Sequence, residues 1–316
     1  MGFSSASARA TAIGMLAPCF WGMSVGIVRS IKEDFGAALG YPLMYGAAFL
    51  LMLLIFGRPD LRKFPKRFLF VAIPMANLCA VAFVVSMASS SGGAQTVQAG
   101  MVNYSWPCLV ILFSIVFNGQ KARWWVLIGA AVCMIGVLTV MGGDAGLSLE
   151  DLEKNFAANP LSYGCAAASA LTWAAYSSMT RAWSGGQNPV VPIFFVDFLI
   201  FALYWLWCGA PAIPEHVGLR GWIDVTAGAL AFGLAYACWT YGSVKGSLTL
   251  LGVASYFTPV LSCVFATFWI GADLSLAFWK GVFLVVAGSV ICWLATRSAD
   301  KKPGTPLPLR APKDRG

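Results

Sequence analysis

The chain contains 316 residues, of which 59% are hydrophobic and 11% are charged, and it carries a formal net charge of +8. Soluble domains contain roughly 45–50% apolar and about 25% charged residues, so this composition excludes an ordinary soluble domain. Lipid has to cover much of the protein surface, and the sequence therefore predicts an integral membrane protein.

Ten apolar stretches of spanning length follow one another along the chain. A transmembrane helix needs about 20 apolar residues to cross a hydrocarbon core of ~30 Å. The stretches are apolar almost throughout, whereas the strands of a membrane barrel alternate between apolar and polar residues. The predicted spans are residues 9–28, 41–57, 68–88, 95–117, 124–141, 161–180, 190–208, 222–243, 248–270 and 277–296. We therefore expect an all-α membrane protein with ten transmembrane helices.

Basic residues fall mainly on one side of the membrane when the connections between spans are assigned to alternate sides. Sixteen of the 21 Lys and Arg residues lie on one side, whereas the other side has Arg29, Lys32, Lys154, Arg220 and Lys280. Cytoplasmic connections carry the basic excess in membrane proteins, so both termini are predicted to be cytoplasmic. This topology explains the positive net charge, and no nucleic-acid partner is expected.

Eight residues of the first half recur in the second half at a constant offset of 152 positions. The residues Trp21, Arg29, Gly100, Tyr104, Pro107, Gly119, Gly129 and Gly136 recur as Trp173, Arg181, Gly252, Tyr256, Pro259, Gly271, Gly281 and Gly288. The shared offset indicates two structural repeats, and five spans in each half require the second repeat to be inverted. Inverted repeats around a site at the membrane midplane are typical of secondary transporters.

The repeats divide the chain into four segments. These are the first five-span repeat at 1–147, an amphipathic linker helix on the outer membrane surface at 148–160, the inverted second five-span repeat at 161–297 and a disordered cytoplasmic tail at 298–316. The linker helix is predicted from Leu149, Leu152 and Phe156, which recur at helical spacing behind a capping box that begins at Ser148. The tail contains prolines and scattered charges, a composition typical of disorder.

Sequence motifs for catalysis, nucleotide hydrolysis and metal binding are absent from the chain. His216 is the only histidine, and no GxxxxGK[ST] phosphate-binding loop occurs. The nine cysteines all fall in predicted spans without a CxxC pair, so we expect neither a zinc site nor a disulfide framework. The sequence therefore predicts no enzyme activity, no cofactor and no metal.

Aromatic and polar side chains within the spans predict a substrate site. Tryptophan and tyrosine usually lie at the lipid headgroups, but Trp21 and Trp173 fall more than halfway along their spans, and Tyr104 and Tyr256 lie near span centres. Their N–H and O–H groups need partners at that depth, which either a wet cavity or a neighbouring helix provides. A cavity walled by such rings suits an apolar or aromatic solute with a small polar head. The predicted substrate-binding residues are Trp21, Asn77, Gln98, Asn103, Tyr104, Trp106, Trp173, Tyr176, Tyr236, Trp239 and Tyr256.

Two prolines and one acid inside the spans are further candidates. Pro107 and Pro259 occupy equivalent positions in the two repeats, and each is predicted to kink its span and serve as a hinge. Asp197 is the only carboxylate predicted inside the membrane, where an acid is a candidate site for a proton, a cation or a substrate ammonium group. Its counterpart region in the first repeat, residues 47–49, has no acid. Snorkelling of Asp197 toward the cytoplasm is the alternative interpretation.

Residues 9–297 resemble the drug/metabolite transporter superfamily, in its bacterial ten-span type built from two EamA-like repeats. The resemblance is carried by Trp21 and Arg29 at the first span and by the Tyr104-x-x-Pro107 motif, each with its repeat counterpart. Within the superfamily the chain most closely resembles the aromatic amino acid exporters of the bacterial inner membrane. The resemblance implies a basket-like helix bundle with a central cavity and both termini in the cytoplasm.

The leading functional hypothesis is an inner-membrane secondary transporter that exports aromatic and other neutral amino acids by alternating access. Its expected partners are the amino acid substrate and the lipid bilayer, and a monomer is expected rather than an obligate oligomer. An exporter of another small metabolite or drug is the nearest alternative, which substrate competition would test. A non-transporting sensor or assembly subunit is a second alternative, and an integral-membrane enzyme is a third. Flux through purified protein in vesicles would separate these from a transporter.

Overall fold

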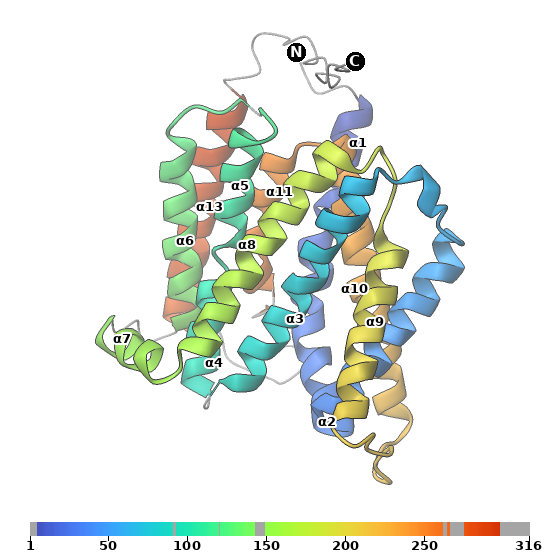
Figure 1. The fold of residues 1–316 in the computed structure, drawn as a ribbon. Coiled ribbons are helices and arrows are strands. Elements are labelled where there is room, and N and C mark those ends of the chain that lie inside the picture. The colour runs from blue at the N-terminus through green and yellow to red at the C-terminus, as the bar shows by residue number, and fades with distance from the viewer. Residues whose placement is uncertain are drawn as a thin grey trace.

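The computed structural model describes residues 5–90, 93–119, 121–142, 149–261, 264–265 and 275–297. All regular elements within these ranges are helices, and they form an elongated bundle (Figure 1). Their bounds are α1 (Ser5–Gly14), α2 (Leu16–Phe56), η1 (Leu61–Lys63), η2 (Phe68–Ala72), α3 (Ile73–Ser89), α4 (Gly93–Asn103), α5 (Trp106–Val116), α6 (Val126–Gly142), α7 (Leu149–Ala158), α8 (Pro160–Trp183), α9 (Val190–Trp207), α10 (Leu219–Lys245), α11 (Leu248–Ser255) and α13 (Leu276–Arg297). The predicted all-helical architecture is confirmed for these residues.

Six helical segments among the described residues are long and apolar enough to cross a membrane. They are Ser30–Phe56, Phe68–Ser89, Gln98–Val116, Val190–Trp207, Leu219–Lys245 and Leu276–Ala295. Two shorter apolar helices cover Val126–Gly142 and Leu248–Leu261. The 24 residues of α8 extend about 36 Å at 1.5 Å per residue, which also suffices to cross the hydrocarbon core. The helices therefore have the dimensions of a multi-pass membrane protein.

The element α2 consists of two helical legs, which hold residues 16–28 of the first predicted span and residues 41–56 of the second. α2 has 41 residues and bends at Gly36, whose φ of 73° and ψ of 161° are not helical. Glycine adopts a positive φ at little cost because it has no Cβ atom. After the bend the chain folds back, since a Cβ atom built on Gly40 would lie 3.2 Å from the Ile31 carbonyl oxygen. The tail predicted at 298–316 lies outside the described residues.

Exposed tryptophans mark the ends of several long helices. Trp207 is the last residue of α9 and is 88% exposed, while Trp124 lies two residues before the start of α6 and is 75% exposed. Trp222 and Trp279 each lie in the first turn of a helix, α10 and α13, and both are exposed. Tryptophan prefers the membrane interface, where its ring meets acyl chains and its N–H meets water. These positions agree with helices that cross the bilayer.

One end of the bundle carries α1 together with several connections between helices (Figure 1). The backbone N–H of Ser247, after α10, donates to Thr11 Oγ1 of α1 at 3.0 Å. The N–H of Arg123, before α6, donates to the carbonyl of Ala295 near the end of α13 at 3.2 Å. These contacts tie segments from both halves of the chain into one end, which we call the α1 end.

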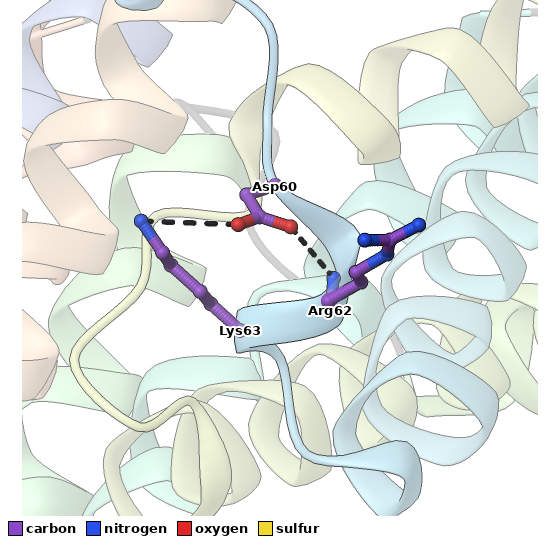
Figure 2. Close-up of polar contacts among 3 residues, drawn as sticks. All are labelled: Asp60, Arg62 and Lys63. Carbon is purple, nitrogen blue, oxygen red and sulfur yellow. Dashed lines mark hydrogen bonds and ion pairs between the residues drawn. The ribbon is translucent and has the colours of Figure 1, made fainter.

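The α2–α3 connection also lies at the α1 end (Figure 1). Its short helix η1 begins behind Asp60, whose carboxylate accepts the backbone N–H of Arg62 at 3.1 Å. The Lys63 ammonium lies 3.8 Å from the other oxygen of the same carboxylate (Figure 2). Both side chains of this ion pair are exposed, so solvent screens it and its contribution to stability is small.

The opposite end of the bundle carries α7 (Figure 1). The Asn155 side chain of α7 donates to Gln98 Oε1 of α4 at 3.0 Å. Asn159, which caps α8, donates from its side chain to the Ser89 carbonyl at the end of α3 at 2.7 Å. A helix thus occupies most of the predicted linker, residues 148–160, and its position on the membrane surface stays a prediction.

The buried apolar side chains form two clusters. The larger one joins α2, α3, α8, α9 and α10, and it includes Trp106 and Val110 of α5. The smaller one joins α5, α6, α11 and α13. The bundle therefore consists of two packed groups of helices that meet along α5, α8 and α11.

The helices α6 and α13 cross at four glycines with their backbones in direct contact. A Cβ atom built on Gly136 would lie 2.7 Å from the Gly281 carbonyl oxygen, and one on Gly288 would lie 2.6 Å from the Gly129 carbonyl oxygen. Only glycine allows so close an approach. Gly129 faces Gly288 while Gly136 faces Gly281, so the two helices run antiparallel. Gly281 and Gly288 stand 152 positions after Gly129 and Gly136, so residues that share the sequence offset meet at this crossing.

Candidate functional site

Five aromatic rings from four helices meet in the larger cluster. We call Trp21, Trp106, Trp173, Tyr236 and Trp239 the aromatic cluster. The Trp21 ring of α2 lies 5.8 Å from Trp106 of α5, 5.4 Å from Trp173 of α8, and 6.0 Å and 5.5 Å from Tyr236 and Trp239 of α10. Most of these pairs meet edge to face, the arrangement that the ring quadrupoles favour.

The aromatic cluster is buried in this conformation. Trp239 is fully buried, Trp106, Trp173 and Tyr236 are at most 8% exposed, and Trp21 is half-buried. The indole N–H of Trp239 donates to Ser177 Oγ at 3.0 Å. The rings therefore fill the space between the helices by packing on one another.

Tyr176 of α8 extends the aromatic cluster toward α10. Its ring lies 5.3 Å from that of Trp173, and its hydroxyl lies 3.4 Å from Thr240 Oγ1. The structure thus brings together six predicted substrate-binding residues, the five of the cluster and Tyr176. Trp21 and Trp173 are repeat counterparts and contact each other directly, whereas the rings of α10 have no aromatic counterparts at the equivalent positions 84 and 87.

Four other predicted substrate-binding residues lie outside the aromatic cluster. Tyr104 and Tyr256 belong to the smaller apolar cluster, where Tyr256 is fully buried. Gln98 accepts the Tyr163 hydroxyl at 2.6 Å toward the α7 end. The Asn103 side chain donates to the Ala166 carbonyl of α8 at 3.4 Å. These polar side chains join α4 to α7 and α8.

Asn77 of α3 and Asp197 of α9 form a buried polar pair. The Asn77 Nδ2 group donates to Asp197 Oδ1 at 2.8 Å and to the Ile193 carbonyl at 3.1 Å. Asn77 is 4% exposed and Asp197 is 0% exposed. Asp197 therefore does not snorkel in this structure, because its carboxylate is enclosed by neighbouring helices.

Both repeats contain a helix break directly before the predicted hinge proline. Residues 104 and 105 form a turn between α4 and α5, and residues 256 and 257 form a turn after α11. In each turn an N–H bonds the carbonyl three residues back, from Ser105 to Val102 at 3.1 Å and from Phe257 to Ala254 at 3.1 Å. Proline lacks the N–H that would continue a regular helix, which explains why both breaks precede Pro107 and Pro259.

Two charged residues have structural contacts that sequence reasoning missed. Arg181, predicted only as a repeat marker, donates to the carbonyls of Ser243 and Gly246 at 2.9 and 2.7 Å and so caps the end of α10. Asp224, which is not among the candidates predicted from the sequence, is 3% exposed and accepts the Ser30 hydroxyl at 2.6 Å. Its position at the start of the apolar run 222–243 was the available signal.

Metal-binding groups are not apparent in the part of the chain that the structure describes. No cluster of three or more His, Cys, Asp or Glu side chains occurs within it. The site is therefore made of rings, hydroxyls, an amide and one carboxylate. Such a lining suits a bound organic solute.

Comparison with known proteins defines the class first and then the family. The fold superposes on a solved crystal structure with a TM-score of 0.73 and 25% identity, covering 93% of this chain and 99% of the other. The EamA-like transporter family matches residues 9–142 and 161–294. The chain is thus a membrane transporter by class, and it belongs to the EamA-like transporter family.

Three curated relatives carry the same name, aromatic amino acid exporter YddG. The relative from Escherichia coli (strain K12) is 37% identical and the one from Salmonella typhimurium (strain 14028s / SGSC 2262) is 35% identical, each over 92% of this chain and 98% and 99% of its own length. The relative from Ancylobacter novellus is 31% identical over 63% of this chain and 68% of its own length.

Proposed function

We propose that this protein is a secondary transporter of the bacterial inner membrane that exports aromatic and other neutral amino acids by alternating access. The observation that carries the proposal is the aromatic cluster, built from helices of both repeats in a chain similar over most of its length to named aromatic amino acid exporters. The fold offers no comparable grouping of catalytic side chains among the described residues, and no enzymatic role is proposed.

The aromatic cluster has the chemistry to hold an aromatic amino acid side chain. Aromatic pairs contribute about 0.5–1.5 kcal/mol each beyond the area that they bury. Trp21 alone contacts four rings of the cluster. A substrate ring that displaces one of these four rings can still contact the other three and Trp21. The rings pack on one another in this conformation, and we propose that a substrate enters when the helices that carry them separate.

We propose that the chain crosses the membrane ten times as two inverted five-helix repeats, with both termini in the cytoplasm. The antiparallel contact of Gly129 with Gly288 and of Gly136 with Gly281 supports an inverted relation between the repeats. The basic side chains of the α2–α3 and α5–α6 connections, together with Arg181 in the last turn of α8, support a cytoplasmic α1 end. The proposed unit is a monomer, in which α7 links the repeats at the outer surface.

The two matched helix breaks support alternating access. They lie in α4–α5 and after α11, the segments where the two apolar clusters meet. Pro107 and Pro259 free backbone groups there, so the segments bend at lower cost than regular helices. We propose that the group containing α6 and α13 moves against the group containing α2, α9 and α10, and that this motion opens the aromatic cluster to each side in turn.

Counterflow in liposomes tests the proposed function. Purified protein is reconstituted in vesicles loaded with unlabelled amino acids, and uptake of labelled tryptophan, phenylalanine, leucine and lysine is measured. The proposal predicts uptake of tryptophan and phenylalanine well above that of lysine. Folded protein that moves none of these amino acids would contradict it and would favour a different metabolite or a non-transport role.

A further inference from the structure

The Asn77–Asp197 pair contains two buried oxygens without a hydrogen-bond donor. Asn77 uses its Nδ2 group to bond Asp197 Oδ1 and the Ile193 carbonyl. Asp197 Oδ2 and Asn77 Oδ1, the remaining oxygens of the pair, have no partner. Buried acceptors are nearly always paired in proteins, so two on one interacting pair require an explanation.

The groups around Asp197 do not supply a positive charge. The titratable side chains near its carboxylate are Tyr45 of α2, Cys79 of α3, Tyr176 of α8 and Tyr236 of α10, and none of them carries a positive charge. No Lys or Arg of the described chain forms an ion pair with it. An isolated buried carboxylate is costly, and it is retained where a proton or another cation binds.

A proton is the cation that fits the enclosed geometry. Asp197 and Asn77 are almost fully buried, and a proton on Oδ2 needs no additional volume. The resulting O–H is the donor that the pair lacks, and Asn77 Oδ1 is the acceptor beside it. A carboxylic acid facing a primary amide satisfies donors and acceptors on both groups.

The pair also borders the aromatic cluster. Tyr236, which interacts with Asp197, contacts the rings of Trp21 at 6.0 Å and Trp173 at 5.0 Å. Phe194, one helical turn before Asp197 on α9, contacts Tyr236 at 5.3 Å. A change of charge at Asp197 therefore acts on helices that hold the proposed substrate site.

We infer that Asp197 and Asn77 form a proton-binding site that couples amino acid export to the proton gradient. The inference rests on the proposed function. A proton from the outer solution binds Asp197 Oδ2, and the new O–H group donates a hydrogen bond to Asn77 Oδ1. When the site opens inward, that O–H bond breaks and the proton passes to cytoplasmic water, while an amino acid moves outward in the same cycle.

Net flux and counterflow separate the proton site from the transport site. Vesicles are loaded with labelled tryptophan, and efflux is measured with the external solution either acidic or matched to the lumen. The wild-type protein should release tryptophan severalfold faster into the acidic solution. Asp197→Asn should lose this acceleration, because an amide cannot take up and release the proton, while it still exchanges labelled for unlabelled tryptophan.

Two further variants sharpen the test. Asp224→Asn is the matched control, because Asp224 is also buried but accepts a hydrogen bond from Ser30, and it should keep the acceleration. Asn77→Ala removes the acceptor for the bound proton and should shift the external pH at which acceleration is half-maximal. Thermal unfolding of each purified variant confirms that it is folded.

The other possible outcomes contradict either the proton site or the proposed function. A wild-type protein that exchanges tryptophan but ignores the gradient overturns the proton site and leaves the proposed function intact. Asp197→Asn that keeps the acceleration overturns it as well. Folded Asp197→Asn without exchange indicates that the carboxylate binds the amino acid ammonium group instead of a proton. A folded wild-type protein that does not exchange tryptophan would contradict the proposed function itself.

Discussion

The crossing of α6 and α13 predicts a strong effect of a single added methyl group. A Cβ atom at Gly136 would lie 2.7 Å from both the Gly281 carbonyl oxygen and the Val285 backbone nitrogen. Ordinary contact begins at 3.4 Å, so Gly136→Ala requires the two backbones to separate by roughly 0.7 Å. Overpacking of this kind costs about 1–3 kcal/mol.

Alanine favours a helix over glycine by about 1 kcal/mol, so a second Gly→Ala variant is needed to correct for this gain. Gly164 lies within α8 and a Cβ atom there would meet nothing within 4 Å. Gly136→Ala should therefore be about 1–3 kcal/mol less stable than Gly164→Ala. Its repeat counterpart in the contact, Gly281→Ala, should be destabilised similarly, since its Cβ atom would lie 2.6 Å from the Gly136 carbonyl oxygen.

Thermal unfolding of the purified variants in detergent checks this prediction. A change of 1 kcal/mol corresponds to roughly 2–4 °C in Tm for domains of about 150–250 residues, so the difference is measurable. If Gly136→Ala and Gly281→Ala both unfold at the temperature of Gly164→Ala, the helices are not in backbone contact. The proposed inverted relation between the repeats would then lose its main structural support.

Three further predictions concern other parts of the bundle. Arg181→Ala should lower the free energy of unfolding by about 1.5–3 kcal/mol, because two backbone carbonyls lose a charged donor, and chemical denaturation measures this change. Pro107→Ala and Pro259→Ala should each slow tryptophan transport without changing the half-saturating concentration, since a straighter helix resists the proposed motion. Lys63→Ala should change the free energy of unfolding by less than about 0.5 kcal/mol, because the Asp60–Lys63 pair is exposed.

For each of these variants, one specific result would contradict the prediction. An Arg181→Ala protein as stable as wild type would mean that the α10 cap does not form. Faster or unchanged transport in both proline variants would remove Pro107 and Pro259 from the proposed hinges. A large loss of stability in Lys63→Ala would show that the Asp60–Lys63 pair contributes more than its exposure indicates.

Much of the architecture follows from local features of the sequence. Span positions depend on runs of apolar residues, which the bilayer thickness requires whatever the tertiary structure. The glycines at 129, 136, 281 and 288 share the repeat offset, and the structure places them at one crossing. Trp21 and Trp173 also share it, and their rings lie 5.4 Å apart.

Contacts between distant segments could not be predicted in the same way. Depth in the membrane suggested that Tyr104 and Tyr256 share a cavity with the tryptophans, but depth does not define which face of a helix a residue occupies. The bond between Asn77 and Asp197 joins residues 120 positions apart and depends on the register of α3 against α9. The bend at Gly36, which separates the two helical legs of α2, depends on the backbone angles of one residue.

The most direct test of the central claim compares two tryptophan variants in the counterflow assay. Trp173 is 5% exposed within the aromatic cluster, whereas Trp279 is 59% exposed on the first turn of α13. Trp173→Ala should lose most tryptophan exchange while remaining folded in the membrane, and Trp279→Ala should exchange tryptophan like the wild type. Equal exchange by the two variants would contradict the assignment of the aromatic cluster as the transport site.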